Sequence, residues 1–517
     1  MSPSEKIPRH TPRTACCPDG GASEPSRGVS RRSFLGGAAL GGLAMANLSW
    51  SVLSAEAPKE EFAPERKPLL VKPVLLYSTF TPHLQTSWRS WGGIQTQRQA
   101  DEEVERIKAE LEKLQAAADF PLQFLPLSAI RSAGEVKNIE DVKSADLVLV
   151  YAAGGDGLEP FGTLGKDVII FVRYRSGPVY LWYEIVSPRY LRQHTDKLSV
   201  KGIDNNDVVV DSQDEILWRL RALCGLKNTR GTRIVAIGGA SGWACPQAPE
   251  LSKDRLQIDI QGVSYDDLGK LIKEARNDAA AVEGARQRAA EYLAQKDISL
   301  ETKKSFVENA FLLETVFKKI MAAAGARAIT VNGCMGTIMP IAETSACLTL
   351  SILNDAGYLA YCESDFVVIP SGILLTMISG RPAFLNDPTY PANGMIAIAH
   401  CTAPRRMDGK NLEPARIVTH FESDYGAAPK VEMHNGQVLT NIIPDFAAVR
   451  WAGLKGEIID HPFFPICRSQ IDVGFKVDPL VVADRMPGFH WMTIYGDYVK
   501  EVGYALKRTK IAWDYLG

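Results

Sequence analysis

The sequence lacks an excess of charge of either sign, since 58 Lys and Arg residues balance 60 Asp and Glu residues to a net charge of −2. Proteins that bind nucleic acid or anionic lipid through bulk electrostatics carry a basic excess, so neither is expected as a partner. Only one long apolar stretch is present, near the N-terminus, which excludes a polytopic membrane protein. The length of 517 residues suggests about three globular domains.

Cysteine is sparse and several catalytic motifs are missing. Seven of the nine cysteines follow residue 57 without a C-x-x-C pair, which excludes a disulfide framework and a zinc-finger pattern. No G-x-x-x-x-G-K-[ST] or H-E-x-x-H motif occurs. The glycine-rich segment 238–242 lacks G-x-G-x-x-G spacing, and Trp243 replaces the last glycine of G-x-S-x-G. P-loop chemistry, hydride transfer and serine hydrolysis therefore have no direct support, and the segment is interpreted as a tight strand-to-helix turn.

The N-terminal region has the pattern of an export signal. Ser30-Arg31-Arg32-Ser33-Phe34-Leu35 precedes a Gly/Ala-rich apolar run, and Ala55-Glu56-Ala57 offers a small-x-small cleavage site. Paired arginines before a mildly hydrophobic run are typical of a twin-arginine signal peptide, predicted here over residues 1–57. The chain is then exported by the twin-arginine machinery to the periplasm or beyond, and it is cytoplasmic if the signal is not used. A basic tail ahead of a helix resting on a membrane is the alternative.

The rest of the chain alternates short buried runs with segments of helical periodicity. This alternation predicts parallel sheets with helices on their faces, and short alternating strands after about residue 380 indicate a β-rich end. We expect an N-terminal α/β domain over 70–200, a central α/β domain over 201–378 and a β-rich C-terminal domain over 379–517. In the central domain we expect strands and helices at the following positions: strands 208–210, 233–237 and 328–331, a helix opened by a capping box at 212–215, and long helices at 265–295 and 300–324.

The most unusual stretch is 342–406, where carboxylates follow a short buried strand at 358–362. Glu363 and Asp365 come directly after this strand. Carboxylates in that position lie at the carboxyl edge of a parallel sheet, where open α/β folds bind ligands. One or two acidic groups there can hold a divalent cation through oxygen ligands.

Several ordered blocks in this half of the chain form a pattern that resembles the L-fucose isomerase/L-arabinose isomerase superfamily. They are Leu353-Asn354-Asp355-x-Gly357, Cys362-Glu363-Ser364-Asp365, Ser379-Gly380-x-Pro382-x-Phe384, His400-Cys401-Thr402-Ala403-Pro404, Thr419-His420-Phe421-Glu422-Ser423 and His490-Trp491-x-x-Ile494-Tyr495-Gly496-Asp497. The resemblance implies two Rossmann-like α/β domains before the β-rich domain, a divalent metal of the Mn²⁺ type and a homo-oligomer. It also implies aldose–ketose isomerisation of a small-molecule sugar, by proton transfer through an ene-diol.

The resemblance also implies site residues. Asp365 matches the family's metal-binding aspartate, with a catalytic role, and His490 matches its late metal-binding histidine. The family's acid/base glutamate falls near Ala346 and Cys347 here, so Glu343, one helical turn upstream, is the candidate for that catalytic and metal-binding role. A solvated carboxylate at a helix start is the alternative for Glu343.

Four further residues are candidates for substrate binding: His400, Arg405, His420 and Glu363. An interdomain polar network is the alternative for His400 and Arg405, and Glu363 shares a side with Asp365 only if the extended segment stays regular. The expected function is an exported, metal-dependent sugar isomerase-like protein. The alternatives are a catalytically silent carbohydrate-binding protein of the same fold, and an epimerase or lyase acting on another polyhydroxylated substrate.

Overall fold

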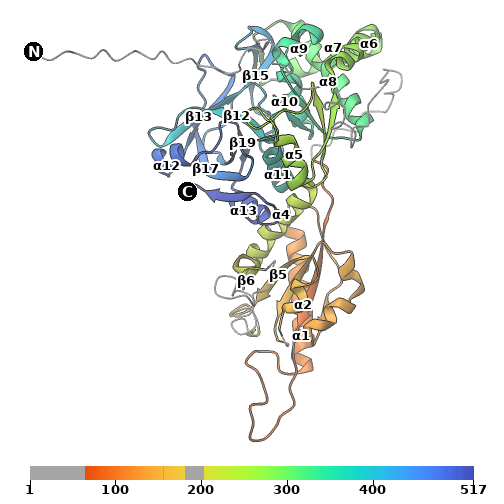
Figure 1. Ribbon diagram of the computed structural model, residues 1–517, viewed down its shortest axis with the longest axis vertical. Coiled ribbons are helices and arrows are strands. Elements are labelled where there is room, and N and C mark those ends of the chain that lie inside the picture. Colours follow the sequence, from red (N-terminus) through yellow and green to blue (C-terminus); the bar gives the residue numbers. More distant parts are fainter. Residues whose placement is uncertain (1–63, 155–156, 181–202) are drawn as a thin grey trace, which may run out of the picture. The chain divides into compact units, whose positions relative to one another are not determined.

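The computed structural model describes residues 64–154, 157–180 and 203–517 (Figure 1). The expected signal peptide at 1–57 lies outside the described residues. Among the described residues, no single helix has the length and apolar character needed to cross a membrane, and one pair of helices, bent by 86°, passes that test only when taken together.

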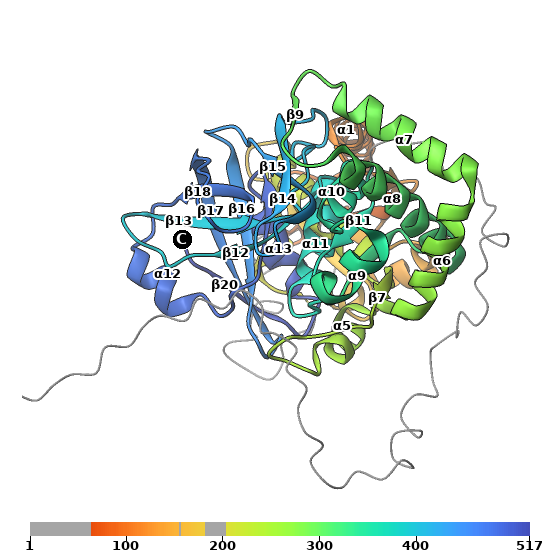
Figure 2. The same cartoon turned by 90° about the horizontal axis from the view of Figure 1, so that it is seen from above.

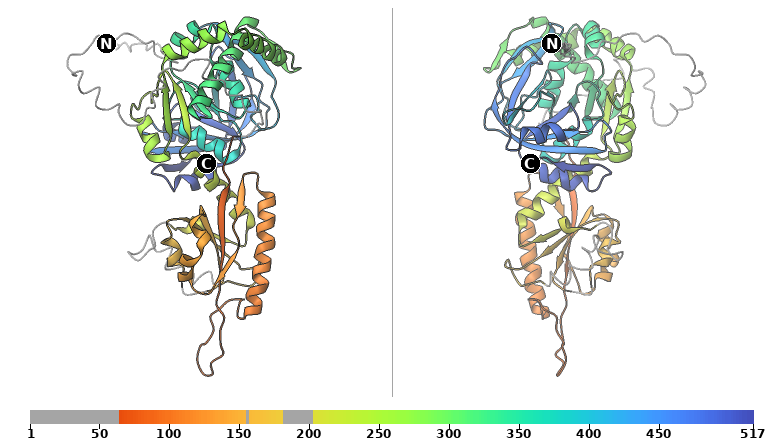
Figure 3. Two further views of the ribbon diagram at one scale, coloured as in Figure 1. Left: turned by 90° about the vertical axis from the view of Figure 1, so that its right-hand side faces the viewer. Right: turned by 60° about the vertical axis from the view of Figure 1, so that its left-hand side comes forward.

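The first sheet is parallel throughout, with the strand order β2-β1-β4-β5-β6 and with β3 beside β1. Helix α1 covers one side of this sheet and short helices cover the other (Figure 3). Thr96 caps α1 through a complete capping box. The expectation that strand 208–210 opens the central unit is wrong, because this strand pairs with β5. The elements are β1 Leu69–Leu76, α1 Gln97–Ala117, β2 Leu122–Phe124, β3 Ser128–Ile130, η2 Ala133–Asn138, η3 Glu140–Lys143, β4 Leu147–Ala152, α2 Glu159–Gly162, β5 Asp167–Val172, η5 Asn205–Asp207 and β6 Val208–Val210.

The second sheet is also parallel, with the strand order β11-β10-β7-β8. Helices α6, α7 and α8 pack together beside it (Figure 2). The single helix expected over 265–295 is two helices, because the carboxylate of Asp278 accepts the first N–H groups of α7. The elements are α4 Gln213–Thr229, β7 Arg233–Ile237, α5 Ala248–Leu256, β8 Asp259–Val263, α6 Tyr265–Asn277, α7 Ala279–Leu293, α8 Lys304–Ala324, β10 Ala328–Val331, α9 Cys334–Ala342, α10 Cys347–Asp355, β11 Leu359–Tyr361 and α11 Ile369–Ser379.

The last part of the chain is built mainly of antiparallel strands. Six of them pair in a closed ring in the order β16-β19-β12-β13-β18-β17, and β17 returns to β16. β20 adds to β17 in parallel, and a separate sheet has the order β15-β14-β9. Two parallel sheets followed by a β-rich unit confirm the expected α/β class. The elements are β9 Ile298–Leu300, β12 Phe384–Pro388, β13 Met395–His400, β14 Ala415–His420, β15 Tyr425–Val431, β16 Val438–Pro444, β17 Arg450–Asp460, β18 Ser469–Gly474, α12 Pro479–Arg485, β19 Trp491–Tyr495, α13 Val499–Leu506 and β20 Ala512–Tyr515.

The end of α10 fixes two segments that carry candidate site residues. The Asn354 amide donates to the Ala360 carbonyl at 2.7 Å and accepts the Ala360 N–H at 2.9 Å, which holds β11 in place. The neighbouring Asp355 Oδ1 accepts the backbone N–H groups of Arg405 and Arg406, both at 2.8 Å, and so anchors the segment that follows β13. The Leu-Asn-Asp block therefore acts as a structural brace, because each polar side chain satisfies buried backbone groups.

Asp355 gives a prediction about pH. Burial raises the pKa of this carboxyl to about 7, although the Arg405 and Arg406 backbone N–H groups oppose the shift. Its pKa in the unfolded chain is near 3.8, so the folded state binds the proton more tightly and its stability falls as pH rises from about 4 to about 7. We expect Asp355→Asn to remove this dependence, which amounts to at most about 4 kcal/mol.

The measurement is the free energy of unfolding by urea at several pH values, for both chains. The side-chain oxygen of the introduced asparagine can accept the same two N–H groups, so the variant is expected to fold. At each pH the free energy of unfolding of the variant is subtracted from that of the unmodified chain. The contributions of all other titrating groups cancel, because these groups are common to both chains. A difference that does not change between pH 4 and pH 8 would contradict the assignment.

Candidate active site around His490

Three neighbouring strands of the closed ring bring Asp387, His400 and His490 together. β12 lies between β13 and β19, with Asn386 opposite Trp491 and Asp387 opposite Ala399. Continuing the β12–β19 register by one residue places Asp387 opposite His490. His400 follows Ala399 at the end of β13 and approaches the same group through Glu363. One carboxylate and two imidazoles thus come from three neighbouring strands.

His490 is held from both of its ring nitrogens. Nδ1 donates to Asp365 Oδ2 at 2.6 Å, and Nε2 lies 3.1 Å from Glu363 Oε2 and 3.2 Å from Asp387 Oδ1. Burial opposes the charged ring, but the carboxylates of Asp365, Asp387 and Glu363 outweigh it and raise the pKa of His490 to about 12. Without a metal the imidazolium is thus the cation that balances these carboxylates.

Glu363 lies at the centre of the group, because both imidazoles approach it. His400 Nε2 lies 3.6 Å from Glu363 Oε1, and His400 Nδ1 is 3.0 Å from the Thr402 hydroxyl. Burial opposes ionisation of Glu363, but His400 and His490 outweigh it and hold the pKa of this carboxyl well below its usual range. Cys362 Sγ, a Glu363 oxygen and a His400 nitrogen all lie within 4.8 Å of one another, close enough to share one metal ion.

The backbone after β11 turns sharply. Glu363 and Ser364 have φ angles of 66° and 49°, in the left-handed region that non-glycine residues rarely adopt. This turn brings Glu363 and Asp365 to opposite nitrogens of His490, which regular extension would not do. The loop after β7 supports it, since Ser241 N–H donates to the Ser364 carbonyl at 3.0 Å and Phe366 N–H donates to the Ser241 carbonyl at 2.9 Å. The carboxylates therefore stand at the carboxyl edge of the second sheet, as the sequence predicted.

Trp243 adds an aromatic wall. Its ring lies 4.5 Å from that of Phe489 and 5.5 Å from that of His490, and 42% of the residue is exposed. An aromatic ring that is packed on one side and open on the other suits the apolar face of a sugar. Neither Trp243 nor Asp387 was expected at this position from the sequence. Only the placement of Asp387 next to the Phe384 block hinted at its role.

Two of the expected site residues make their contacts elsewhere. Glu343 pairs with Arg276, has a side chain that is 58% exposed, and makes none of the described contacts of the His490 group. Arg405 is buried, and its guanidinium donates to the Glu413 carbonyl at 2.8 Å and to Gln295 Oε1 at 2.7 Å. Arg405 thus joins Glu413 and Gln295 in a polar network, and an interdomain polar network was the alternative expected for it.

His420 and Glu422 lie at the end of β14, near enough to sense the charges of the group. His420 Nδ1 is 3.0 Å from the Ser423 hydroxyl, and its Nε2 is 3.8 Å from Glu422 Oε2. Burial lowers the pKa of His420. Burial raises the pKa of Glu422, and the nearby Cys401, Glu363 and Asp387 act in the same direction. The surroundings of Glu422 therefore favour its protonated form relative to an ordinary surface glutamate.

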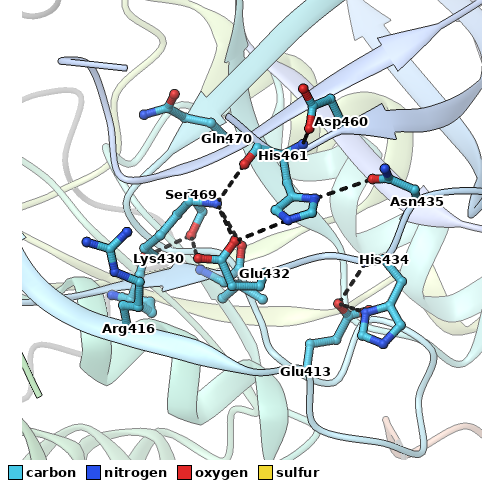
Figure 4. Close-up of polar contacts among 12 residues, drawn as sticks. Glu413, Arg416, Lys430, Glu432, His434, Asn435, Asp460, His461, Ser469 and Gln470 are labelled. Atoms are coloured by element: carbon cyan, nitrogen blue, oxygen red, sulfur yellow. Dashed lines mark hydrogen bonds and ion pairs between the residues drawn. The ribbon is translucent and has the colours of Figure 1, made fainter. Parts of the chain in front are cut away.

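A second polar cluster surrounds the buried Lys430 (Figure 4). Its Nζ donates to Glu432 Oε2 at 2.9 Å, and His461 Nε2 lies 3.7 Å from the same oxygen. Ser469 completes the link between β15 and β18 by accepting from Val431 N–H and donating to the Pro429 carbonyl. Burial lowers the pKa of Lys430. These groups satisfy one another, so the cluster serves to join strands.

No protein family profile matches the chain, and no curated protein matches it at a significant level.

The left-handed turn gives a prediction about stability. Ser364→Gly and Ser364→Ala both remove the same buried hydroxyl, but only glycine tolerates a φ of 49° without steric cost. We expect the glycine variant to be more stable than the alanine variant by about 1 kcal/mol. Chemical denaturation of both variants measures this difference.

Ser351 supplies the matched control, since it is also buried but lies inside α10. There glycine is expected to be less stable than alanine by about 1 kcal/mol. The same sign at both positions would show that Ser364 is not constrained to the left-handed region.

Proposed function

We propose that the protein is a divalent-metal-dependent isomerase acting on polyhydroxylated substrates, with an aldose and a ketose as its pair. The observation that carries the proposal is the arrangement at His490, whose Nε2 faces the carboxylates of Glu363 and Asp387 while its Nδ1 is held by Asp365. A histidine oriented by one carboxylate and open toward two others is the pattern that metal-binding sites use.

The donor set fits a cation of the Mn²⁺ type. Carboxylate oxygens and imidazole nitrogens suit Mn²⁺, and a metal at Nε2 would take the place of its proton. The buried Asp387 Oδ1 lies 3.2 Å from His490 Nε2, so a metal that replaced the Nε2 proton would lie within reach of this oxygen. We assign Glu363, Asp387 and His490 as the residues that would hold the metal, with His400 and Cys362 beside them. Asp365 then orients His490, and Glu363 changes from a substrate-binding to a metal-binding role.

When bound, the metal would polarise the substrate's carbonyl and hydroxyl oxygens and so favour the ene-diol. The chain's own residues then bind the substrate and move one proton. Trp243 stacks against the sugar's apolar face, and His400 orients a hydroxyl group. We assign the proton transfer between C1 and C2 to Glu422, a carboxylate that follows β14 and lies 3.8 Å from His420 Nε2, and its raised pKa favours uptake of a proton.

A catalytically silent carbohydrate-binding protein is the second candidate, and one observation favours it. Cys347, near the position where the resemblance places the acid/base glutamate, is buried among other cysteines, while Glu343 pairs with Arg276. Neither residue supplies a carboxylate to the His490 group. If Glu422 does not replace that glutamate, the site binds without turning substrate over. An epimerase or lyase using the same ene-diol is distinguished by proton exchange without ketose.

Four further features belong to the same proposal. The two parallel sheets are Rossmann-like units of the superfamily that the motif blocks resemble. The chain is exported by the twin-arginine route, acts as a homo-oligomer and takes a small-molecule sugar as its partner, with no nucleic acid. The support is the ordered set of motif blocks and the N-terminal pattern.

The metal assignment predicts graded losses of Mn²⁺ affinity. We expect Glu363→Gln and Asp387→Asn each to weaken binding by more than about 100-fold, because each removes a ligand. Asp365→Asn is expected to weaken it by about 10- to 100-fold, because it only orients His490. The Mn²⁺ electron paramagnetic resonance signal, recorded during titration of the chelator-treated chain, reports free metal.

Glu343→Gln is the matched control and should leave Mn²⁺ affinity unchanged, since that side chain pairs with Arg276. If Glu343→Gln alone lost Mn²⁺ affinity, Glu343 would be the metal ligand and the present assignment would be wrong. Unchanged affinity in both Glu363→Gln and Asp387→Asn would reject the site.

Turnover tests the reaction itself. We expect ketose formation from one of a panel of aldoses with Mn²⁺, abolished by EDTA and by His490→Ala. Glu422→Gln should lower the rate by about 100- to 10,000-fold while Mn²⁺ affinity changes less than about twofold. No turnover, with sugar binding that ignores EDTA, would favour the silent binding protein instead.

A further inference from the structure

Three cysteine thiols meet beside His400. Cys401 follows His400 at the end of β13, Cys467 lies just before β18, and Cys347 is the first residue of α10. Cys401 is the most deeply buried of the three, and Cys347 and Cys467 belong to the same cluster. The three side chains pack as one small cluster with Ala428, and all three are free thiols.

The strand register places Cys401 and Cys467 at the same end of one antiparallel ladder. β13 pairs with β18, and their last pair is His400 with Ser469. Cys401 is one residue beyond that pair and Cys467 is two residues beyond it. Continuing the register sets Cys401 opposite Arg468, so Cys401 and Cys467 are offset by one residue. Their packing in the same cluster is what brings the two side chains together.

The two sulfurs differ in their access to solvent. Cys467 is partly exposed, whereas Cys401 is 2% exposed. A dissolved oxidant thus reacts first with Cys467. Cys401 is the neighbouring thiol that can then attack the mixed disulfide formed on Cys467. Cys347 is buried on α10 and lies away from the surface.

We propose that Cys401 and Cys467 form a reversible disulfide, with a low-molecular-weight disulfide such as oxidised glutathione as the oxidant. The Cys467 thiolate attacks one glutathione sulfur, the glutathione S–S bond breaks, and one glutathione thiolate leaves. The Cys401 thiolate then attacks the Cys467 sulfur of the mixed disulfide and expels the second glutathione. Two protein thiols lose two protons and two electrons, and one glutathione disulfide becomes two thiols. Cys347 stays reduced.

The bond would tie the segment before β18 to the residue that follows His400. It closes a long chain loop, so the oxidised protein should unfold at a temperature higher by roughly 4 °C. The proposal stands apart from the proposed isomerase function, because it concerns sulfur chemistry that needs neither metal nor sugar.

The test incubates the purified chain with oxidised glutathione, alkylates the remaining thiols, digests the protein and measures peptide masses. The expected product is a peptide pair linked through Cys401 and Cys467, lighter by two hydrogen atoms than the separate peptides and lost on reduction. Thermal unfolding of oxidised and reduced chain is recorded in parallel.

Variants make the assignment falsifiable. Cys467→Ser replaces a partly exposed residue, should fold, and should lose both the linked pair and the rise in unfolding temperature. Cys224→Ser is the control, since that buried cysteine lies outside the cluster and should leave both results unchanged. A bond between Cys401 and Cys347, or glutathione retained on Cys467 with no internal bond, would overturn the proposal.

Discussion

The contact between Asp365 and His490 is the constraint on which the candidate site depends. It joins the loop that follows a parallel strand to the residue just before a strand of the antiparallel ring, across 125 residues of sequence. Because Asp365 Oδ1 also accepts the Val367 N–H at 3.0 Å, the carboxylate is fixed before it orients the imidazole. The opposite nitrogen then faces Glu363 and Asp387, and the charge balance of the group follows from that single orientation.

Two kinds of restraint hold the site residues in position. Backbone registers in the ring place Asp387, His400 and His490, so these residues are as well fixed as the ladder itself. Glu363 depends instead on a strained turn, held by hydrogen bonds from the loop after β7. Backbone strain of this kind is found at functional sites, where a side chain has to be held in one orientation. The brace formed by Asn354 and Asp355 connects the two halves, because one residue holds β11 and the next holds the segment after β13.

Much of this arrangement could be predicted from the sequence, and the remainder shows what sequence patterns omit. Hydrophobic runs located the parallel strands and the β-rich end, and the placement of Glu363 and Asp365 after a buried strand located the edge of the sheet. The break at Asp278 was missed because one capping side chain interrupted a continuous periodicity. Asp387 and Trp243 were missed because only strand register and a loop conformation bring them to His490. Glu343 was favoured by its spacing along a helix, but its φ of 52° ends α9 there and turns the carboxylate to Arg276.

The closed ring has a consequence for the order of folding. β19 pairs with β12 and β16, which come from much earlier in the chain, so the ring closes only after the segment carrying His490 has been made. Contacts between such distant residues form late, because loop-closure entropy opposes them until the other strands are in place. A nascent chain that ends before His490 can build both parallel sheets and still present Glu363 and Asp365 with no imidazole between them. Any ion that requires all of these groups can therefore be captured only after synthesis of β19.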